Sequence, residues 1–84
     1  MTAITLTRSD PVRNVHRYYR LDVQQDLFSA WCLIREWGRI GGGCRLRSIP
    51  YSTEPEARVA FDHQLRRRLR RGYLVKVGLI ADTN

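Results

Sequence analysis

The chain has 84 residues, 43% of them apolar, and its 15 Lys and Arg against 8 Asp and Glu give a formal net charge of +7. A chain of this length forms one small domain, so we expect a single domain over residues 1–84 without the interdomain cleft of a two-domain enzyme. The apolar content excludes a disordered basic tail, and no apolar run is long enough to cross a membrane. Residues 1–5 lack the features of a signal peptide, which predicts a cytoplasmic protein.

The two cysteines, Cys32 and Cys44, have no partner at the short spacings typical of disulfide frameworks or metal clusters. In a reducing compartment such cysteines are usually free, partly buried thiols, and we expect the same here. Neither histidine lies at a workable ligand spacing from a cysteine, which argues against a zinc site. We therefore expect no metal and no other cofactor.

Alternation of apolar and polar residues predicts the first strands. Residues 4–7 form a short expected strand, which Ser9-Asp10-Pro11 ends. Residues 18–23 form a half-buried expected strand, whose inner side consists of Tyr19, Leu21 and Val23. A hairpin turn is expected over 24–26 and a long strand over 27–37. Because both sides of that long strand are largely apolar, we place it in the interior of the sheet.

Three consecutive glycines, Gly41 to Gly43, allow a sharp turn or a close approach of the backbone to a ligand. A strand over 44–49 is expected next, with Arg45 and Arg47 pointing to the same side. Pro50 either ends that strand or confines it to the edge of the sheet.

A capping box predicts a helix from residue 54 to about residue 71. Thr53 and Glu56 can bond each other's backbone amides at its start, and Pro55 occupies its first turn at no cost in hydrogen bonds. The apolar stripe of this helix has three- and four-residue spacings and comprises Ala57, Ala60, Phe61, Leu65 and Leu69.

The end of the helix is also predicted. Gly72 suits the left-handed position after a helix, and Tyr73 can fold back on the last turn. Residues 74–80 are then expected to form a short strand or a packed tail. The whole chain has room for one helix layered on one sheet.

Most of the positive charge lies in the second half, because residues 1–43 carry a net charge of +2 and residues 44–84 carry +5. Fourteen of the fifteen cations are arginines, whose planar fork suits bidentate contact with phosphate. The densest cluster comprises Arg66, Arg67, Arg68, Arg70, Arg71 and Lys76. It predicts a patch that binds polyanions, although a solvated helix end complementing the helix dipole explains it as well.

Helical geometry divides this cluster. At about 100° per residue, His63, Arg66, Arg67 and Arg70 gather on the side away from the apolar stripe. Arg68 lies nearer the apolar edge and has to lay its stem along the core. We therefore take Arg66, Arg67 and Arg70 as candidate phosphate contacts, together with Arg45 and Arg47.

The segment Trp37-Gly38-Arg39-Ile40-Gly41 places an indole, a bare backbone unit and a guanidinium at the end of an expected strand. The indole offers a flat face to a sugar or base, and Arg39 offers a fork to a phosphate. The alternative is structural: Trp37 covers the core, and Arg39 pairs with Glu36 or Asp22.

This segment does not stand alone, because Tyr18-Tyr19-Arg20-Leu21 precedes it in the sequence. An expected helix with Ala57 and Phe61 follows it and ends at Gly72-Tyr73. In this order and spacing, the three parts resemble the WGR domain over residues 14–73. The resemblance implies an α+β fold, a small and mostly antiparallel sheet with one long helix packed across it. WGR domains occur in DNA-dependent poly(ADP-ribose) polymerases, in bacterial regulators and as stand-alone bacterial proteins. In the polymerases they are not catalytic, bind DNA at a break near a 5′ end, and relay that binding to neighbouring domains.

The resemblance also implies roles for single residues. Trp37 corresponds to the tryptophan that packs on the sugar of a terminal nucleotide, and Arg39 to the arginine at the DNA and interdomain contact. Gly38 stands between them, and Asn14 matches an asparagine that can contact the DNA backbone. Because the loop over 41–44 is short, a contact made by a longer polymerase loop does not carry over.

The sequence therefore predicts a non-catalytic module that binds nucleic acid, most of all DNA with an end, nick or gap. The alternative is a protein-interaction module that docks an acidic partner without binding DNA. We expect no enzyme, because the acids show no paired spacing, Cys32 lies on an apolar strand face and His63 lies among arginines. No membrane partner is expected, and the protein is expected to be a monomer or a homodimer, the latter through an edge formed by residues 74–80.

Overall fold

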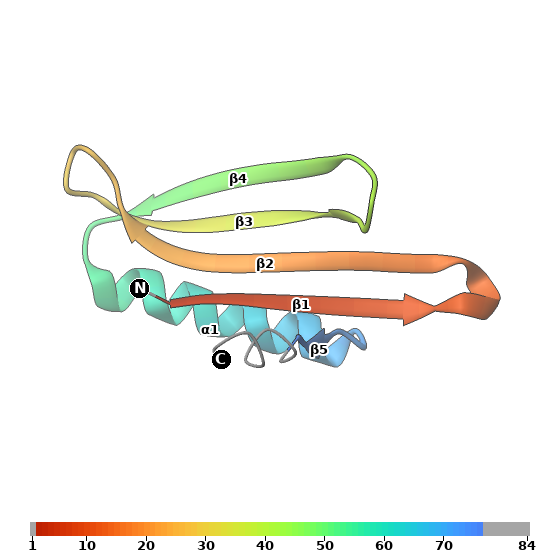
Figure 1. The fold of residues 1–84 in the computed structure, drawn as a ribbon. Coiled ribbons are helices and arrows are strands. Elements are labelled where there is room, and N and C mark those ends of the chain that lie inside the picture. The colour runs from red at the N-terminus through yellow and green to blue at the C-terminus, as the bar shows by residue number, and fades with distance from the viewer. Residues whose placement is uncertain (1, 77–84) are drawn as a thin grey trace, which may run out of the picture.

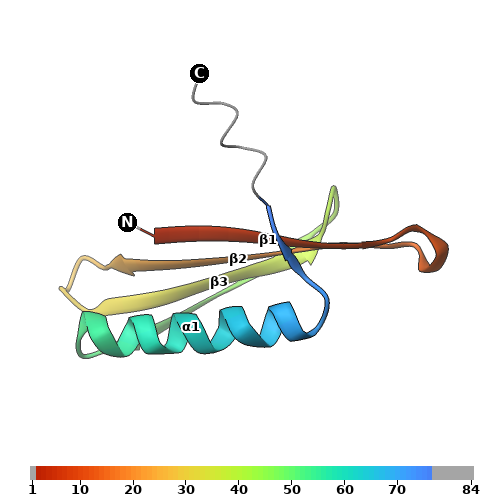
Figure 2. The ribbon, with the colours of Figure 1, turned by 90° about the horizontal axis from the view of Figure 1, so that it is seen from below.

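The computed structural model describes residues 2–76 as one five-stranded antiparallel sheet with a single helix packed across one face (Figures 1 and 2). The strand order is β4-β3-β2-β1-β5. This arrangement confirms the α+β fold class. The elements are β1 (Thr2–Asp10), a 3-10 turn η1 (Pro11–Arg13), β2 (Val15–Gln25), β3 (Trp31–Arg39), β4 (Cys44–Tyr51), α1 (Glu54–Arg70) and β5 (Leu74–Val75).

β1 and β2 form a longer hairpin than the sequence predicted. Their ladder extends from the pair Thr2 and Val23 to the pair Asp10 and Val15, and it includes both predicted strands. β1 ends at Asp10, as expected, because Pro11 begins η1 and lacks the amide that a strand would use. The Asp10 side chain caps this turn. Because its two strands are long, the β1–β2 hairpin projects beyond β3 and β4 (Figure 1).

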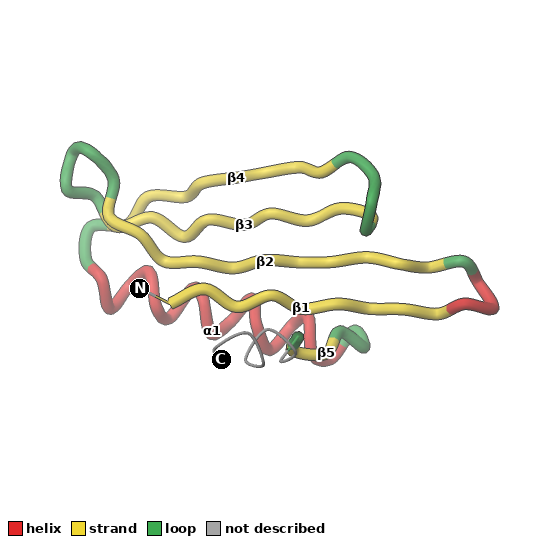
Figure 3. The backbone as a smooth tube through the Cα atoms, viewed as in Figure 1, coloured by secondary structure: helices red, strands yellow, loops and turns green. Residues whose placement is uncertain are grey.

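The predicted turn at 24–26 and the start of the predicted strand at 27 are both wrong. β2 continues through Gln25, and β3 begins only at Trp31. The reason is Asp26, whose Oδ1 accepts hydrogen bonds from the amides of Phe28 and Ala30 and so competes with strand pairing. The resulting loop is one of the green segments in Figure 3. β3 does lie in the interior of the sheet, between β2 and β4, as expected.

β4 is an outer strand of the sheet and runs through Pro50 to Tyr51. Pro50 therefore confines the strand to the edge and does not end it. The two cysteines are free thiols, as expected. Cys32 is buried, but Cys44 at the start of β4 is exposed, which corrects the expectation of a partly buried group.

The capping box at the start of α1 is confirmed, because the Thr53 side chain accepts from the Glu56 amide while the Glu56 side chain accepts from the Thr53 amide. The helix ends through Gly72, whose φ of +92° favours glycine, and Tyr73 donates its amide to the carbonyl of Arg68. Tyr73 folds back on the last turn, as predicted, and it is buried. Leu69 is not part of the buried stripe, since 44% of it is exposed.

The core lies between α1 and one face of the sheet (Figure 2). β2 contributes the alternate residues Tyr19, Leu21 and Val23, which confirms the predicted inner side of that strand. Its buried members are Leu6, Tyr19, Leu21, Val23, Leu33, Ala57, Phe61 and Tyr73. Within residues 2–76, no helix has both the length and the apolar character needed to span a bilayer. The part of the predicted final strand from residue 77 onward lies outside the described residues.

Candidate functional site

Trp37 lies on the helix-covered face of the sheet, directly opposite Tyr19 in the pairing of β3 with β2. The two rings stack with centroids 5.8 Å apart and planes inclined by 15°. Trp37 is half-buried and packs against the core cluster, so the indole does cover the core, as the structural alternative held. It also remains partly exposed at the end of β3, and it is therefore accessible to a ligand.

Two guanidinium groups rest on this aromatic pair. The Cζ atom of Arg35 lies 5.4 Å from the Trp37 ring centroid, and its Nε donates a 2.6 Å hydrogen bond to the Tyr19 hydroxyl. The Cζ atom of Arg68 lies 4.4 Å from the centroid of Tyr19, within the range of cation–π attraction. The Nε of Arg68 is buried and has no hydrogen-bond partner in the described chain.

Arg39 binds Asn14 and none of the carboxylates within residues 2–76. Its Nη1 donates to the Asn14 carbonyl and its Nη2 to Asn14 Oδ1, each at 3.0 Å. The expected alternative, an ion pair with Glu36 or Asp22, is wrong because strand alternation places both carboxylates on the opposite face of the sheet.

On that opposite face, Glu36 accepts a 2.8 Å hydrogen bond from the Tyr18 hydroxyl. This bond, with burial and the nearby Cys44 as further causes, raises the pKa of the Tyr18 phenol well above its usual range. The Glu36 carboxylate is therefore engaged away from the arginines around Trp37.

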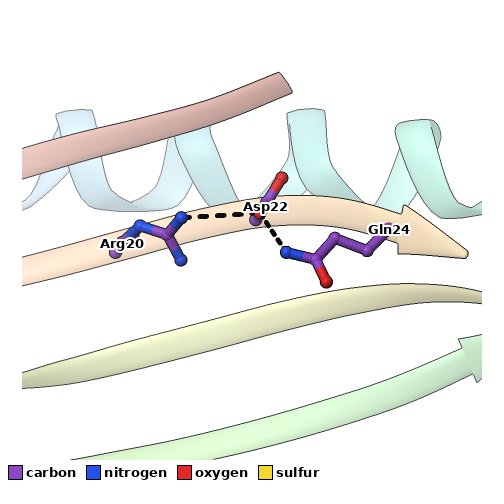
Figure 4. A network of polar contacts seen from close by, with 3 residues as sticks. All are labelled: Arg20, Asp22 and Gln24. Carbon is purple, nitrogen blue, oxygen red and sulfur yellow. Dashed lines mark hydrogen bonds and ion pairs between the residues drawn. The ribbon is translucent and has the colours of Figure 1, made fainter. Parts of the chain in front are cut away.

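Asp22 is also engaged on the opposite face (Figure 4). Its Oδ2 accepts a 2.6 Å hydrogen bond from Gln24 and a 3.5 Å contact from Arg20, while Oδ1 has no partner among the described residues. Asp22 is fully buried, so its charge acts on Arg20 and Gln24. Neither predicted carboxylate partner thus neutralises the face that carries Trp37.

The register of the strands gathers arginines around Trp37. Residues that share its side of the sheet alternate along β1, β2, β3 and β4, and Arg68 reaches the same place from α1. We call this set the arginine face: Arg8, Arg17, Arg35, Arg39, Arg45, Arg47 and Arg68. None of the seven forms an ion pair with another residue of segment 2–76. The ion pairs there join Arg13 with Asp10, Arg20 with Asp22, and Arg58 with Glu54.

Trp37 stands between two hollows of this face. The larger, of about 510 Å³, is lined by the rings of Tyr19, Trp37 and Tyr73, by Gly38, and by four arginines, namely Arg17, Arg35, Arg39 and Arg68. The smaller, of about 330 Å³, lies toward β4 and is lined by Trp37, Gly38, Gly43, Cys44 and Arg45. The arrangement offers aromatic surface and cationic forks to the same ligand.

Gly38 has a structural reason to be glycine. A Cβ atom at this position would lie 2.4 Å from the carbonyl oxygen of Gly43 and 2.9 Å from the Cα of Cys44. The missing side chain therefore lets the two arms of the β3–β4 hairpin approach each other beside Trp37.

The structure brings several of the predicted residues together. Trp37, Gly38 and Arg39 lie together, Asn14 joins them through Arg39, and Arg45 and Arg47 pair across the ladder with Trp37 and Arg35. The predicted phosphate contacts on the helix lie elsewhere. These residues are exposed and line neither hollow: Arg66, Arg67 and Arg70.

Three lining arginines were not named from the sequence. Arg35 lies two residues before Trp37, and strand alternation alone places it on the same side. Arg68 was expected to lie along the core, which the structure confirms, but its contact with Tyr19 was not foreseen. Arg17 faces Arg39 across the β2–β3 ladder, which requires knowledge of the register.

A small antiparallel sheet crossed by one helix defines a compact α+β module. Its partly exposed tryptophan lies among arginines that form no ion pair within residues 2–76. The sequence model of the WGR domain family matches residues 2–78, and the chain belongs to this family. Among curated proteins, the uncharacterized protein y4dW of Sinorhizobium fredii is 39% identical over 66 residues, which is 79% of this chain. The matched region spans only 32% of the length of that relative. No solved structure matches the chain.

Proposed function

We propose that the protein is a non-catalytic module that binds DNA at an end, a nick or a gap. The observation that carries this proposal is the arginine face, seven guanidinium groups around the partly exposed indole of Trp37 that have no carboxylate partner among the residues the structure describes. The DNA-break binding of WGR domains in the polymerases supports the same function by resemblance.

The proposed contacts divide by chemistry. The arginines contact phosphates, which positions the DNA without reading its sequence and makes affinity fall steeply with salt. The indole of Trp37 packs on the sugar or base of a terminal nucleotide, which continuous duplex does not expose. Asn14 keeps Arg39 in place and contacts the DNA backbone beside it.

Binding to blunt-ended, nicked and covalently closed circular DNA across a salt series tests this proposal. Trp37→Ala is expected to weaken binding to the ended and nicked forms more than to the closed circle. Trp31→Ala is the matched control, because Trp31 lies on the same face of β3, also packs against the core, and lines neither hollow.

Two outcomes would count against the proposal. Equal losses on ended and closed DNA would refute the role of Trp37 at a terminus. No binding of the wild-type chain to short ended duplexes at moderate salt would refute DNA binding and favour the docking of an acidic protein on the same arginines.

A further inference from the structure

The loop between β2 and β3 is held in one conformation at the end of the molecule away from Trp37 (Figure 1). The amide of Asp26 donates to the carbonyl of Ala30 at 2.9 Å, and the amide of Ser29 donates to the carbonyl of Asp26. Asp26 Oδ1 accepts from two further amides of the loop, at 2.8 and 2.9 Å. The backbone of this loop is therefore fixed by its own hydrogen bonds.

This fixed loop holds two large apolar side chains in solvent. Leu27 is 98% exposed and Phe28 is 89% exposed. An aromatic side chain on a rigid backbone binds with little loss of conformational entropy, which is typical of the anchor residues of interfaces. We call the pair Leu27 and Phe28 the apolar tip.

An open apolar hollow lies at the same end of the molecule. It has a volume of about 820 Å³, and Val59 on its helical side is 70% exposed. Its apolar lining comes from the end of the loop, the end of β4 and the first turns of α1, through Ala30, Pro50, Tyr51, Pro55 and Val59.

We propose that a second copy of this chain docks here as a two-fold dimer, in which the apolar tip of each copy enters the hollow of the other. A surface that carries both a projecting and a receiving element is self-complementary, as a two-fold interface requires. The two equivalent contacts of such a dimer then cover both elements on both copies.

Two chains that each carry +7 repel each other, and docking at this end brings together the part of the surface where carboxylates offset the positive charge. The carboxylates of Asp26, Glu54 and Glu56 lie at the loop and the start of α1, where Arg58 is paired with Glu54. The arginine face around Trp37 lies at the other end of the sheet, so docking at the apolar tip keeps the two arginine-rich ends apart (Figure 1). Since few side chains take part, the interface is small and a weak dimer is expected.

Sedimentation or light scattering on the full chain, from about 1 µM to about 1 mM, tests this proposal. The wild type is expected to dimerise within this range, and Phe28→Ser and Val59→Arg are each expected to raise the dissociation constant about tenfold or more. Val12→Ser is the control, because Val12 is 95% exposed in the turn at the opposite end. Circular dichroism checks that each variant is folded.

Mixing the two variants gives a sharper result. Phe28→Ser keeps the hollow without the full tip, and Val59→Arg keeps the tip without the hollow, so each alone lacks the contact. A mixture restores one of the two contacts, and it should form heterodimers more readily than either variant forms homodimers. Added salt should strengthen the dimer by screening like charges, whereas it weakens binding to DNA.

Three results would overturn the proposal: a wild-type monomer at all concentrations, a dimer that neither variant weakens, or a mixture that forms no heterodimer. Each of these leaves the binding of DNA by the monomer unaffected, so the two proposals fail separately.

Discussion

Arg39 donates two hydrogen bonds of 3.0 Å to Asn14, although the two residues are 25 positions apart in the sequence. Asn14 closes the β1–β2 turn with a φ of +56°, a conformation that asparagine tolerates better than most residues. The turn of one hairpin thus fixes the guanidinium at the end of the next strand. The sequence predicted Asn14 and Arg39 as separate DNA contacts, whereas the structure joins them in one hydrogen-bonded pair.

Asn14→Ala and Asn14→Gly separate the two roles of this asparagine. The alanine variant is expected to lose about 1–2 kcal/mol of unfolding free energy, because alanine lacks the short polar side chain with which asparagine tolerates the left-handed conformation and accepts a hydrogen bond from Arg39. The glycine variant should lose less, since it adopts this φ freely and gives up only an exposed hydrogen bond. Urea unfolding measures both losses. Similar losses in the two variants would contradict the conformational role, and weaker binding of ended DNA is expected in both.

Gly38→Ala is expected to destabilise the fold by about 1–3 kcal/mol, because the new Cβ atom would meet the backbone of the neighbouring arm. Gly43→Ala is the matched control, since nothing lies within 4 Å of a Cβ atom there. Its effect on unfolding free energy should stay within about 0.5 kcal/mol. Thermal and urea unfolding compare the two variants, and equal stability would show that the hairpin adjusts to the extra methyl group.

The arginines of the larger hollow and those on the outer side of the helix should affect DNA binding differently. Arg17→Gln is expected to weaken binding to ended DNA more than to closed circular DNA, because Arg17 lies beside Trp37. Reversing the charges of Arg66, Arg67 and Arg70 together should lower binding uniformly, since we propose that these exposed residues make a second phosphate contact.

Fluorescence titrations across a salt series distinguish the two cases. Each lost phosphate contact reduces the slope of log affinity against log salt by about 0.9. The charge reversal should therefore flatten the slope on every DNA form. The opposite result would be a preference for ended DNA that survives Arg17→Gln and disappears with the helix variant. It would show that the helix arginines, and not Arg17, recognise the DNA end.

The Tyr18–Glu36 hydrogen bond predicts a change in stability at alkaline pH. Because the folded chain raises the pKa of the Tyr18 phenol, it holds this proton more tightly than the unfolded chain does. The resulting stabilisation is present below the unfolded pKa of about 10 and is lost as the pH rises above it. Glu36→Gln should lower the pKa of Tyr18 toward the ordinary value. Absorbance titration of tyrosinate, with Tyr18→Phe to identify the signal, measures this change, and an unaltered titration curve would contradict it.

Local patterns in the sequence were enough to predict the helix and the sides of the strands. The capping box at Thr53, the end at Gly72 and the buried Tyr19 depend on neighbouring residues only, so they were predicted correctly. The loop at Asp26 was missed because its side chain bonds the backbone of residues that an apolar pattern assigns to a strand.

The arrangement of the arginines around Trp37 could not be predicted from the spacing of residues in the sequence. Which arginines surround Trp37 depends on the register of four strands and on where the helix crosses them. Leu69 was assigned to the core by its spacing from Leu65, yet it is exposed, while Arg68 lies over Tyr19. At about 100° per residue, position 68 lies about 20° from the direction of the buried Phe61 and position 69 about 80° from it. The bond of Arg39 to Asn14 likewise arises only where two hairpins meet.

The last turn of α1 supplies Arg68, and the chain that leaves it supplies Tyr73, while Tyr19 and Trp37 come from the sheet. Any anion held between these groups would fasten the helix end to the strands beneath it. Amide protons of this turn should then exchange with solvent more slowly when the hollow is occupied. Binding of an anion by these few side chains would thus also stabilise the packing of the helix end on the sheet.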